Sequence, residues 1–107
     1  MVTIRGLGAG SGVATGILRV VRNAEAAAGF QRGDVLATEM TSPDMLEAMM
    51  KSVGFVTQHG GRTCHAAVVA RQMGKPCVVG LGDEFLKLRD GGFVSVDAGT
   101  GVVTLLD

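Results

Sequence analysis

Apolar residues along this chain fall into short runs that glycine-rich turns separate. Runs of three to six residues, rich in Val and often bounded by Gly or Asp, predict strands. The predicted strands cover residues 2–4, 16–21, 35–38, 55–57, 77–79, 93–97 and 102–106. The last two flank a Gly-Thr-Gly turn, so we expect them to form a hairpin.

The first clear helical pattern begins after residue 41. Ser42 suits an N-cap and Pro43 suits the first helical position. An apolar stripe follows at Met45, Leu46, Met49, Met50 and Val53. Lys51 suits the last turn and Gly54 the stop. We expect this stripe to lie in the core.

A second helical pattern begins after a Gly-Gly turn at residues 60 and 61, with Thr63 as its expected N-cap. Its apolar positions follow the spacing i, i+3, i+4, i+7 and are Ala66, Val69, Ala70 and Met73. Gly74 and Pro76 are expected to end it. Shorter helical turns are predicted within residues 23–29 and 83–89, and residues 6–12 are expected to form a glycine-rich turn.

The order of these elements predicts the fold class. A regular alternation of strands and helices would need more helix than this chain offers. We therefore expect a compact α/β domain with a mixed sheet or barrel-like strand core and two main helices. A chain of 107 residues is one domain by length, so we assign residues 1–107 to a single domain.

Composition narrows the classes of function. Nearly half of the residues are apolar, and the ten basic and ten acidic residues cancel. This balance gives no electrostatic footprint for nucleic acid, and no apolar run is long enough to span a bilayer. The first residues do not resemble a signal peptide, so we expect a cytoplasmic location. The two cysteines are expected to be free thiols.

The strongest candidate chemistry lies at residues 60–67, Gly-Gly-Arg-Thr-Cys-His-Ala-Ala. The glycines allow the backbone to approach a ligand closely, and a helix N-terminus favours an anion. His65 falls in the first turn, where the helix dipole disfavours the imidazolium form and keeps a lone pair available for attack. The guanidinium of Arg62 could contact the same anion.

Other interpretations of these residues stay open on spacing alone. A histidine near a helix start is most often structural, and Thr63 could be a plain cap. Cys64 beside His65 suggests a thiol nucleophile, but no residue can be identified that would orient the pair. His59 and His65 lack a third metal ligand, so no metal site is expected.

The same residues closely resemble a known family, the phosphohistidine swivelling domain of phosphoenolpyruvate-utilising enzymes. The likeness runs from residue 57 to residue 80 and centres on the Gly-Gly-x-Thr-Cys-His-Ala-Ala core. It extends to the Gly/Ser-rich residues 8–16, the Thr-Ser-Pro-Asp-Met run at 41–45 and the closing residues 94–101. Among the family's members, phosphoenolpyruvate synthase and pyruvate phosphate dikinase resemble it more than enzyme I of the sugar phosphotransferase system.

This resemblance implies a swivelling β/β/α carrier domain. His65 would accept a phosphoryl group and shuttle it between an ATP-grasp domain and a TIM-barrel domain that binds pyruvate or phosphoenolpyruvate. Gly60, Gly61, Arg62 and Thr63 would bind the phosphoryl group. Thr63 also matches a threonine that regulatory kinases modify in synthases and dikinases, where an added dianion would repel phosphate.

The remaining expectations concern partners. The chain has no nucleotide-binding loop and no carboxylate cluster for magnesium, so ATP and Mg²⁺ are expected on partner domains, in the same longer chain or separate. The small or apolar residues Cys64, Ala67 and Val68 are expected to form a smooth docking patch beside His65. The alternative function is a non-catalytic docking or regulatory module that retains the fold.

Overall fold

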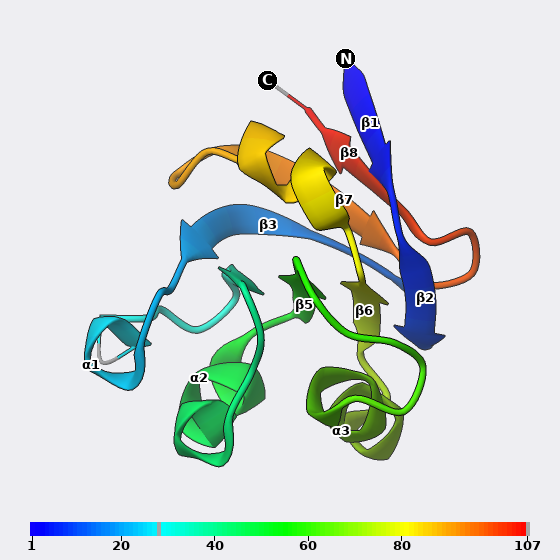
Figure 1. Cartoon of the computed structure of the whole chain (residues 1–107). Coiled ribbons are helices and arrows are strands. Elements are labelled where there is room, and N and C mark those ends of the chain that lie inside the picture. Colours follow the sequence, from blue (N-terminus) through cyan, green and yellow to red (C-terminus); the bar gives the residue numbers. More distant parts are fainter. Residues whose placement is uncertain (28, 107) are drawn as a thin grey trace.

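Eight strands form one mixed sheet in the computed structural model, which describes residues 1–27 and 29–106 (Figure 1). The strands are β1 (Val2–Arg5), β2 (Leu7–Gly10), β3 (Val13–Val20), β4 (Val35–Thr38), β5 (Gly54–Thr57), β6 (Pro76–Val79), β7 (Phe93–Asp97) and β8 (Val102–Leu105). Their order in the sheet is β1-β8-β7-β3-β4-β5-β6-β2. The pairs β3–β4, β4–β5 and β5–β6 are parallel, and the other pairs are antiparallel.

The sheet is barrel-like because its two edge strands are consecutive in the chain. Only Gly6 separates β1 from β2, so one bent segment pairs with β8 on one side and with β6 on the other. The amide of Gly6 donates to the carbonyl of Gly101 at 2.9 Å. At Gly8 a Cβ would lie 1.9 Å from the carbonyl oxygen of Ala98, so closure at this point requires glycine.

The parallel strands are buried on both faces. Along β4, Val35 and Ala37 pack inside the curved sheet, while Leu36 faces the helices. Along β5, Val56 packs inside the curved sheet and Phe55 faces the helices. Strands with two buried faces need continuous apolar runs, which explains why these segments lack polar alternation.

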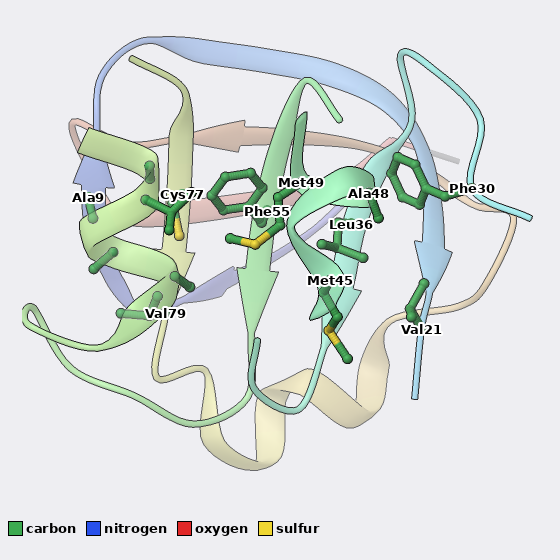
Figure 2. Packing of buried hydrophobic residues seen from close by; sticks show 14 residues of the cluster. Ala9, Val21, Phe30, Leu36, Met45, Ala48, Met49, Phe55, Cys77 and Val79 are labelled. Atoms are coloured by element: carbon green, nitrogen blue, oxygen red, sulfur yellow. The ribbon is translucent and has the colours of Figure 1, made fainter. Parts of the chain in front are cut away.

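The helical elements are α1 (Ala24–Ala27), the 3₁₀ turn η1 (Pro43–Met45), α2 (Leu46–Lys51), α3 (His65–Met73) and the 3₁₀ segment η2 (Gly82–Lys87). The helices α2 and α3 lie on the same side of the sheet (Figure 1). Figure 2 shows the cluster they cover, which includes Phe55 of β5, Leu36 of β4 and Met49 of α2.

The helix after residue 41 differs from the prediction in extent and in its buried face. Ser42 and Pro43 begin it as expected, but a 3₁₀ turn opens it and it ends at Lys51. The buried stripe is Met45, Ala48 and Met49. Leu46 and Met50, predicted in the core, are 41% and 59% exposed. A helix this short turns only one narrow face to the sheet.

The end of this helix was also predicted too late. Ser52 follows the last helical residue, and its backbone is extended. Val53 therefore lies outside the helix and packs against the inner cluster, while Gly54 is the first residue of β5 rather than a helix stop.

The second helix begins one residue later than expected. Cys64, not Thr63, precedes α3, and no side chain caps it. The amide of Cys64 donates to the carbonyl of Gly61 at 3.1 Å, so a turn occupies the residues where the cap was expected. Gly74 ends the helix in the left-handed conformation, as predicted.

Most predicted strands and the closing hairpin are confirmed, and the mixed barrel-like sheet agrees with the expected fold class. The glycine-rich residues 6–12 hold strand β2, which was not predicted because two of its four residues are glycines, Gly8 against the backbone of Ala98 and Gly10 against that of Lys75. The predicted turns at 23–29 and 83–89 contain α1 and most of η2, and residue 28 lies outside the described residues. Across the described part of the chain, no helix could cross a membrane.

Candidate functional site

The candidate site lies where the parallel strands β4 and β5 end. Thr38 and Thr57 are register partners at the last position of these strands, and both are buried. The hydroxyl of Thr57 donates to the carbonyl of His59 at 2.7 Å, and that of Thr38 donates to the carbonyl of Met40 at 3.3 Å. Each threonine therefore holds the loop that follows its own strand, and the two loops meet at the sheet edge where ligands of parallel sheets bind.

His65 is the first residue of α3 and is partly buried. Its Nδ1 lies 2.7 Å from Oγ1 of Thr41, at the start of the loop that leads into η1. Which atom donates depends on the tautomer of the ring. The contact leaves Nε2 as the ring nitrogen without a partner in this pair. Two segments 24 residues apart thus fix the orientation of the imidazole.

A cavity of about 190 Å³ opens beside His65. It is lined by Met40, Thr41, Thr57, His59, Gly60, Cys64, His65 and Ala66. Gly60 has φ 121°, and a Cβ there would lie 2.8 Å from Sγ of Cys64. Both its backbone and the space around it therefore require glycine.

Only one of the four predicted phosphate-binding residues lines the cavity beside His65. Gly60 lines the cavity with His65, whereas Gly61, Arg62 and Thr63 do not. Arg62 and Thr63 are exposed in the turn that precedes α3. Because the first intrahelical bond runs from the amide of Val68 to the carbonyl of Cys64, the amides before Val68 have no intrahelical acceptor. The anion-favouring helix end predicted from the sequence is therefore beside His65.

The two cysteines differ in environment. Cys77 is fully buried on β6, and burial raises the pKa of its thiol to about 12, with the neighbouring Cys64 adding to the rise. Cys64 is partly buried and lines the cavity. Both are free thiols, as predicted. Within the described residues, no group of three or more His, Cys, Asp or Glu side chains could hold a metal ion.

The predicted docking patch is wrong at one position. Ala67 is completely buried, because α3 packs against both β2 and β6 and so buries a wider face than its apolar spacing suggests. Val68 is 40% exposed, one helical turn after His65. Met40, which the sequence did not suggest, is 60% exposed at the cavity and takes part in the apolar surface near the histidine.

Thr41 is a residue of the candidate site that the sequence does not single out beyond its place in the Thr-Ser-Pro-Asp-Met run. A partial signal is its position three residues after the predicted strand at 35–38, because the loops that follow parallel strands share one sheet edge.

Comparison with known proteins places the chain in a family. Residues 30–101 match the family model of the PEP-utilising enzyme, mobile domain. The chain is 43% identical over 102 residues to a probable phosphoenolpyruvate synthase of Methanothermobacter thermautotrophicus, covering 95% of this chain and 15% of that protein. It is 48% identical over 103 residues to the phosphoenolpyruvate synthase of Aeropyrum pernix, covering 95% of this chain and 13% of that protein. The chain therefore spans only a small part of these relatives.

Solved structures agree with this assignment. A solution structure of Enzyme I (nEIt) superposes with a TM-score of 0.63 at 31% identity, over 74% of this chain and 33% of that one. Aconitase X of Thermococcus kodakaraensis superposes over the whole of both chains with a TM-score of 0.71, but at 16% identity it shows the fold alone. The chain belongs to the mobile-domain family of phosphoenolpyruvate-utilising enzymes.

Proposed function

We propose that this chain is the phosphoryl-carrier domain of a phosphotransferase similar to phosphoenolpyruvate synthase or pyruvate phosphate dikinase, with His65 as the residue that is transiently phosphorylated. One observation carries the proposal: the Thr41 hydroxyl lies 2.7 Å from Nδ1 of a histidine at the first position of a helix. A structural histidine does not need a free Nε2 at a helix N-terminus beside a cavity. A nucleophile does.

The step begins from the tautomer that carries its proton on Nδ1. In this form Nδ1–H donates to Oγ1 of Thr41, and the lone pair lies on Nε2. The lone pair attacks phosphorus, a P–Nε2 bond forms, and the P–O bond of the donor breaks with its electron pair going to the leaving oxygen. The ring then loses its Nδ1 proton to water, which leaves a neutral imidazole ring that carries the negatively charged phosphoryl group on Nε2.

A threonine suits both stages of this step. Before transfer its oxygen accepts from Nδ1–H and stabilises the positive charge that the ring gains in the transition state. After the proton has left, the hydroxyl rotates and donates to the Nδ1 lone pair. Thr41 therefore keeps the same ring orientation in the free and the phosphorylated protein.

The phosphoryl group then lies at the N-terminus of α3. The amides of Ala66 and Ala67, together with the helix dipole, favour its negative charge. Gly60, Gly61, Arg62 and Thr63 are the phosphate-binding loop in this proposal, with Arg62 exposed and able to swing toward the phosphoryl oxygens.

We further propose that phosphorylation of the exposed Thr63 hydroxyl would block transfer. A dianion two residues from His65 repels the incoming phosphoryl group.

The donor and acceptor sites are assigned to other domains. No carboxylate is among the residues that line the cavity beside His65, so this cavity does not fit Mg²⁺. Mg²⁺ and ATP are proposed to bind an ATP-grasp domain, and pyruvate or phosphoenolpyruvate a TIM-barrel domain. The exposed apolar side chains of Met40 and Val68 would dock the carrier on each in turn.

The proposal is tested by phosphorylation with partner domains. The chain is incubated with radiolabelled phosphoenolpyruvate and the barrel domain of a synthase relative, or with labelled ATP and its ATP-grasp domain. The expected label is acid-labile, base-stable and lost in His65→Ala. A label that survives this substitution overturns the proposal. An unlabelled chain whose tight partner binding is the same in His65→Gln would identify a docking module instead.

A further inference from the structure

The cavity beside His65 has a second histidine at its rim. His59 lines the same cavity of about 190 Å³, and its side chain is exposed. The chain has two histidines in all, and both are at this site. The mechanism proposed above gives His59 no role. The inference that follows rests on the proposed phosphorylation of His65.

The backbone of His59 is held in place on both sides. Its amide donates to the carbonyl of Glu39 at 2.9 Å, and its carbonyl accepts the hydroxyl of Thr57 at 2.7 Å. Thr57 is the last residue of β5, and Glu39 directly follows the last residue of β4. The imidazole therefore extends from a fixed point and has only its two side-chain torsions to adjust.

Gly60 follows His59 in the chain and lines the same cavity. Any side chain there would meet Sγ of Cys64, because even a Cβ would lie 2.8 Å from that atom. The glycine is thus needed for the geometry of the loop between His59 and α3. Because both histidines line the same small cavity, a group attached to Nε2 of His65 and directed into this cavity would approach His59.

The charges around the cavity single out the same residue. Its titratable lining groups are His59, His65 and Cys64, and none of them carries a fixed positive charge. Of the charged side chains on the adjoining loops, Glu39 is exposed with a carboxylate oxygen 4.0 Å from the guanidinium of Arg22, and Arg62 is exposed. His59 is therefore the lining residue that can meet a phosphoryl dianion with a cation.

We infer that His59 is a phosphoryl-binding residue whose protonated ring donates an N–H to an oxygen of the phosphoryl group on His65. Histidine is the side chain that commonly changes its charge within the physiological pH range, so this contact is expected to strengthen as pH falls through this range. Phosphate on His65 and a proton on His59 favour each other, and by linkage each raises the affinity for the other equally. The phosphorylated carrier would hold its group more firmly as pH falls through this range.

Nuclear magnetic resonance tests the inference with the chain alone. Phosphoramidate transfers its phosphoryl group to histidine: a P–Nε2 bond forms, the P–N bond of the reagent breaks, and ammonia leaves with the electron pair. The species phosphorylated only on His65 is separated by anion exchange. The midpoint of the His59 ring titration is expected to be higher in this species than in the free chain by about one pH unit, the shift that an opposite charge in contact produces. An unchanged midpoint overturns the inference.

Two matched variants test the interaction between His59 and the phosphoryl group by the titration of the phosphoryl group itself. In His59→Gln the ³¹P titration midpoint of the phosphoryl group should rise relative to the wild type, because the neighbouring cation is gone. In His59→Lys, which keeps a cation, the midpoint should stay as low as in the wild type or lower. Equal midpoints in all three chains contradict the inference but leave a carrier role for His65 intact. Failure to phosphorylate His65 at all would overturn both.

Discussion

Replacing Thr41 with valine tests the geometry of the site, since the two side chains have nearly the same shape. The substitution removes the 2.7 Å contact with Nδ1 of His65 and leaves the buried neighbours unchanged. A hydrogen bond to a group that becomes charged contributes about 1.5–3 kcal/mol. If this contribution is made in the transition state, phosphorylation of His65 should slow by about 10- to 150-fold.

The assay has an internal standard in the same molecule. Phosphoramidate also labels the exposed His59, so the ratio of His65 to His59 labelling, read by peptide mass spectrometry, cancels differences in reagent and protein concentration. The ratio should fall in Thr41→Val and recover in Thr41→Ser, which keeps the hydroxyl. A ratio in Thr41→Val equal to that of the wild type would refute the role given to this contact.

Three further predictions concern stability. Gly8→Ala should lower the free energy of unfolding, measured by chemical denaturation, by about 3 kcal/mol or more, because its Cβ would lie 1.9 Å from the carbonyl oxygen of Ala98. In the control Gly29→Ala nothing lies within 4 Å of the new Cβ, so the free energy of unfolding should change little. Equal effects of the two substitutions would contradict sheet closure at Gly8. Burial raises the pKa of Cys77 from 9.0 to about 12, so as pH rises the thiol ionises in the unfolded chain before it ionises in the folded one. The free energy of unfolding should therefore fall by about 1.4 kcal/mol between pH 8 and pH 10, relative to Cys77→Ala. A pH dependence identical in the two proteins would argue against a buried neutral thiol. Lys75→Met should lower the free energy of unfolding by about 2 kcal/mol, because Nζ of Lys75 donates to three carbonyl oxygens at the end of α2 at 2.6–3.0 Å. A melting temperature equal to that of the wild type would show that these hydrogen bonds do not stabilise the end of the helix.

The sequence predicted the parts of the fold that depend on local patterns. Continuous apolar runs identified β4, β5 and β6, and Ser42-Pro43 marked the start of a helical segment. The strand β2 was not predicted because two of its four residues are glycines. These glycines are required by the close approach of other chain segments, and glycine has a low strand propensity. Sheet closure is a contact between distant residues, and local patterns do not report such contacts.

The candidate site was predicted in the same uneven way. His65 could be found because its motif is contiguous, and its place at the start of α3 followed from the helical spacing. Thr41 and Met40 were not singled out, since they reach the site through the parallel pairing of β4 with β5, and the position of Thr41 after a predicted strand is only a partial signal. Ala67 was misplaced because the apolar spacing of α3 does not show that the helix contacts two strands at once.

The central claim is that Nε2 of His65 carries the phosphoryl group while Nδ1 stays with Thr41. The most direct measurement is the one-bond coupling between ³¹P and ¹⁵N in chain labelled with ¹⁵N and phosphorylated by phosphoenolpyruvate and a synthase barrel domain. We expect one phosphorus resonance, coupled to Nε2 of His65 and absent in His65→Gln. Coupling to Nδ1, or a phosphate on any other residue, would contradict it.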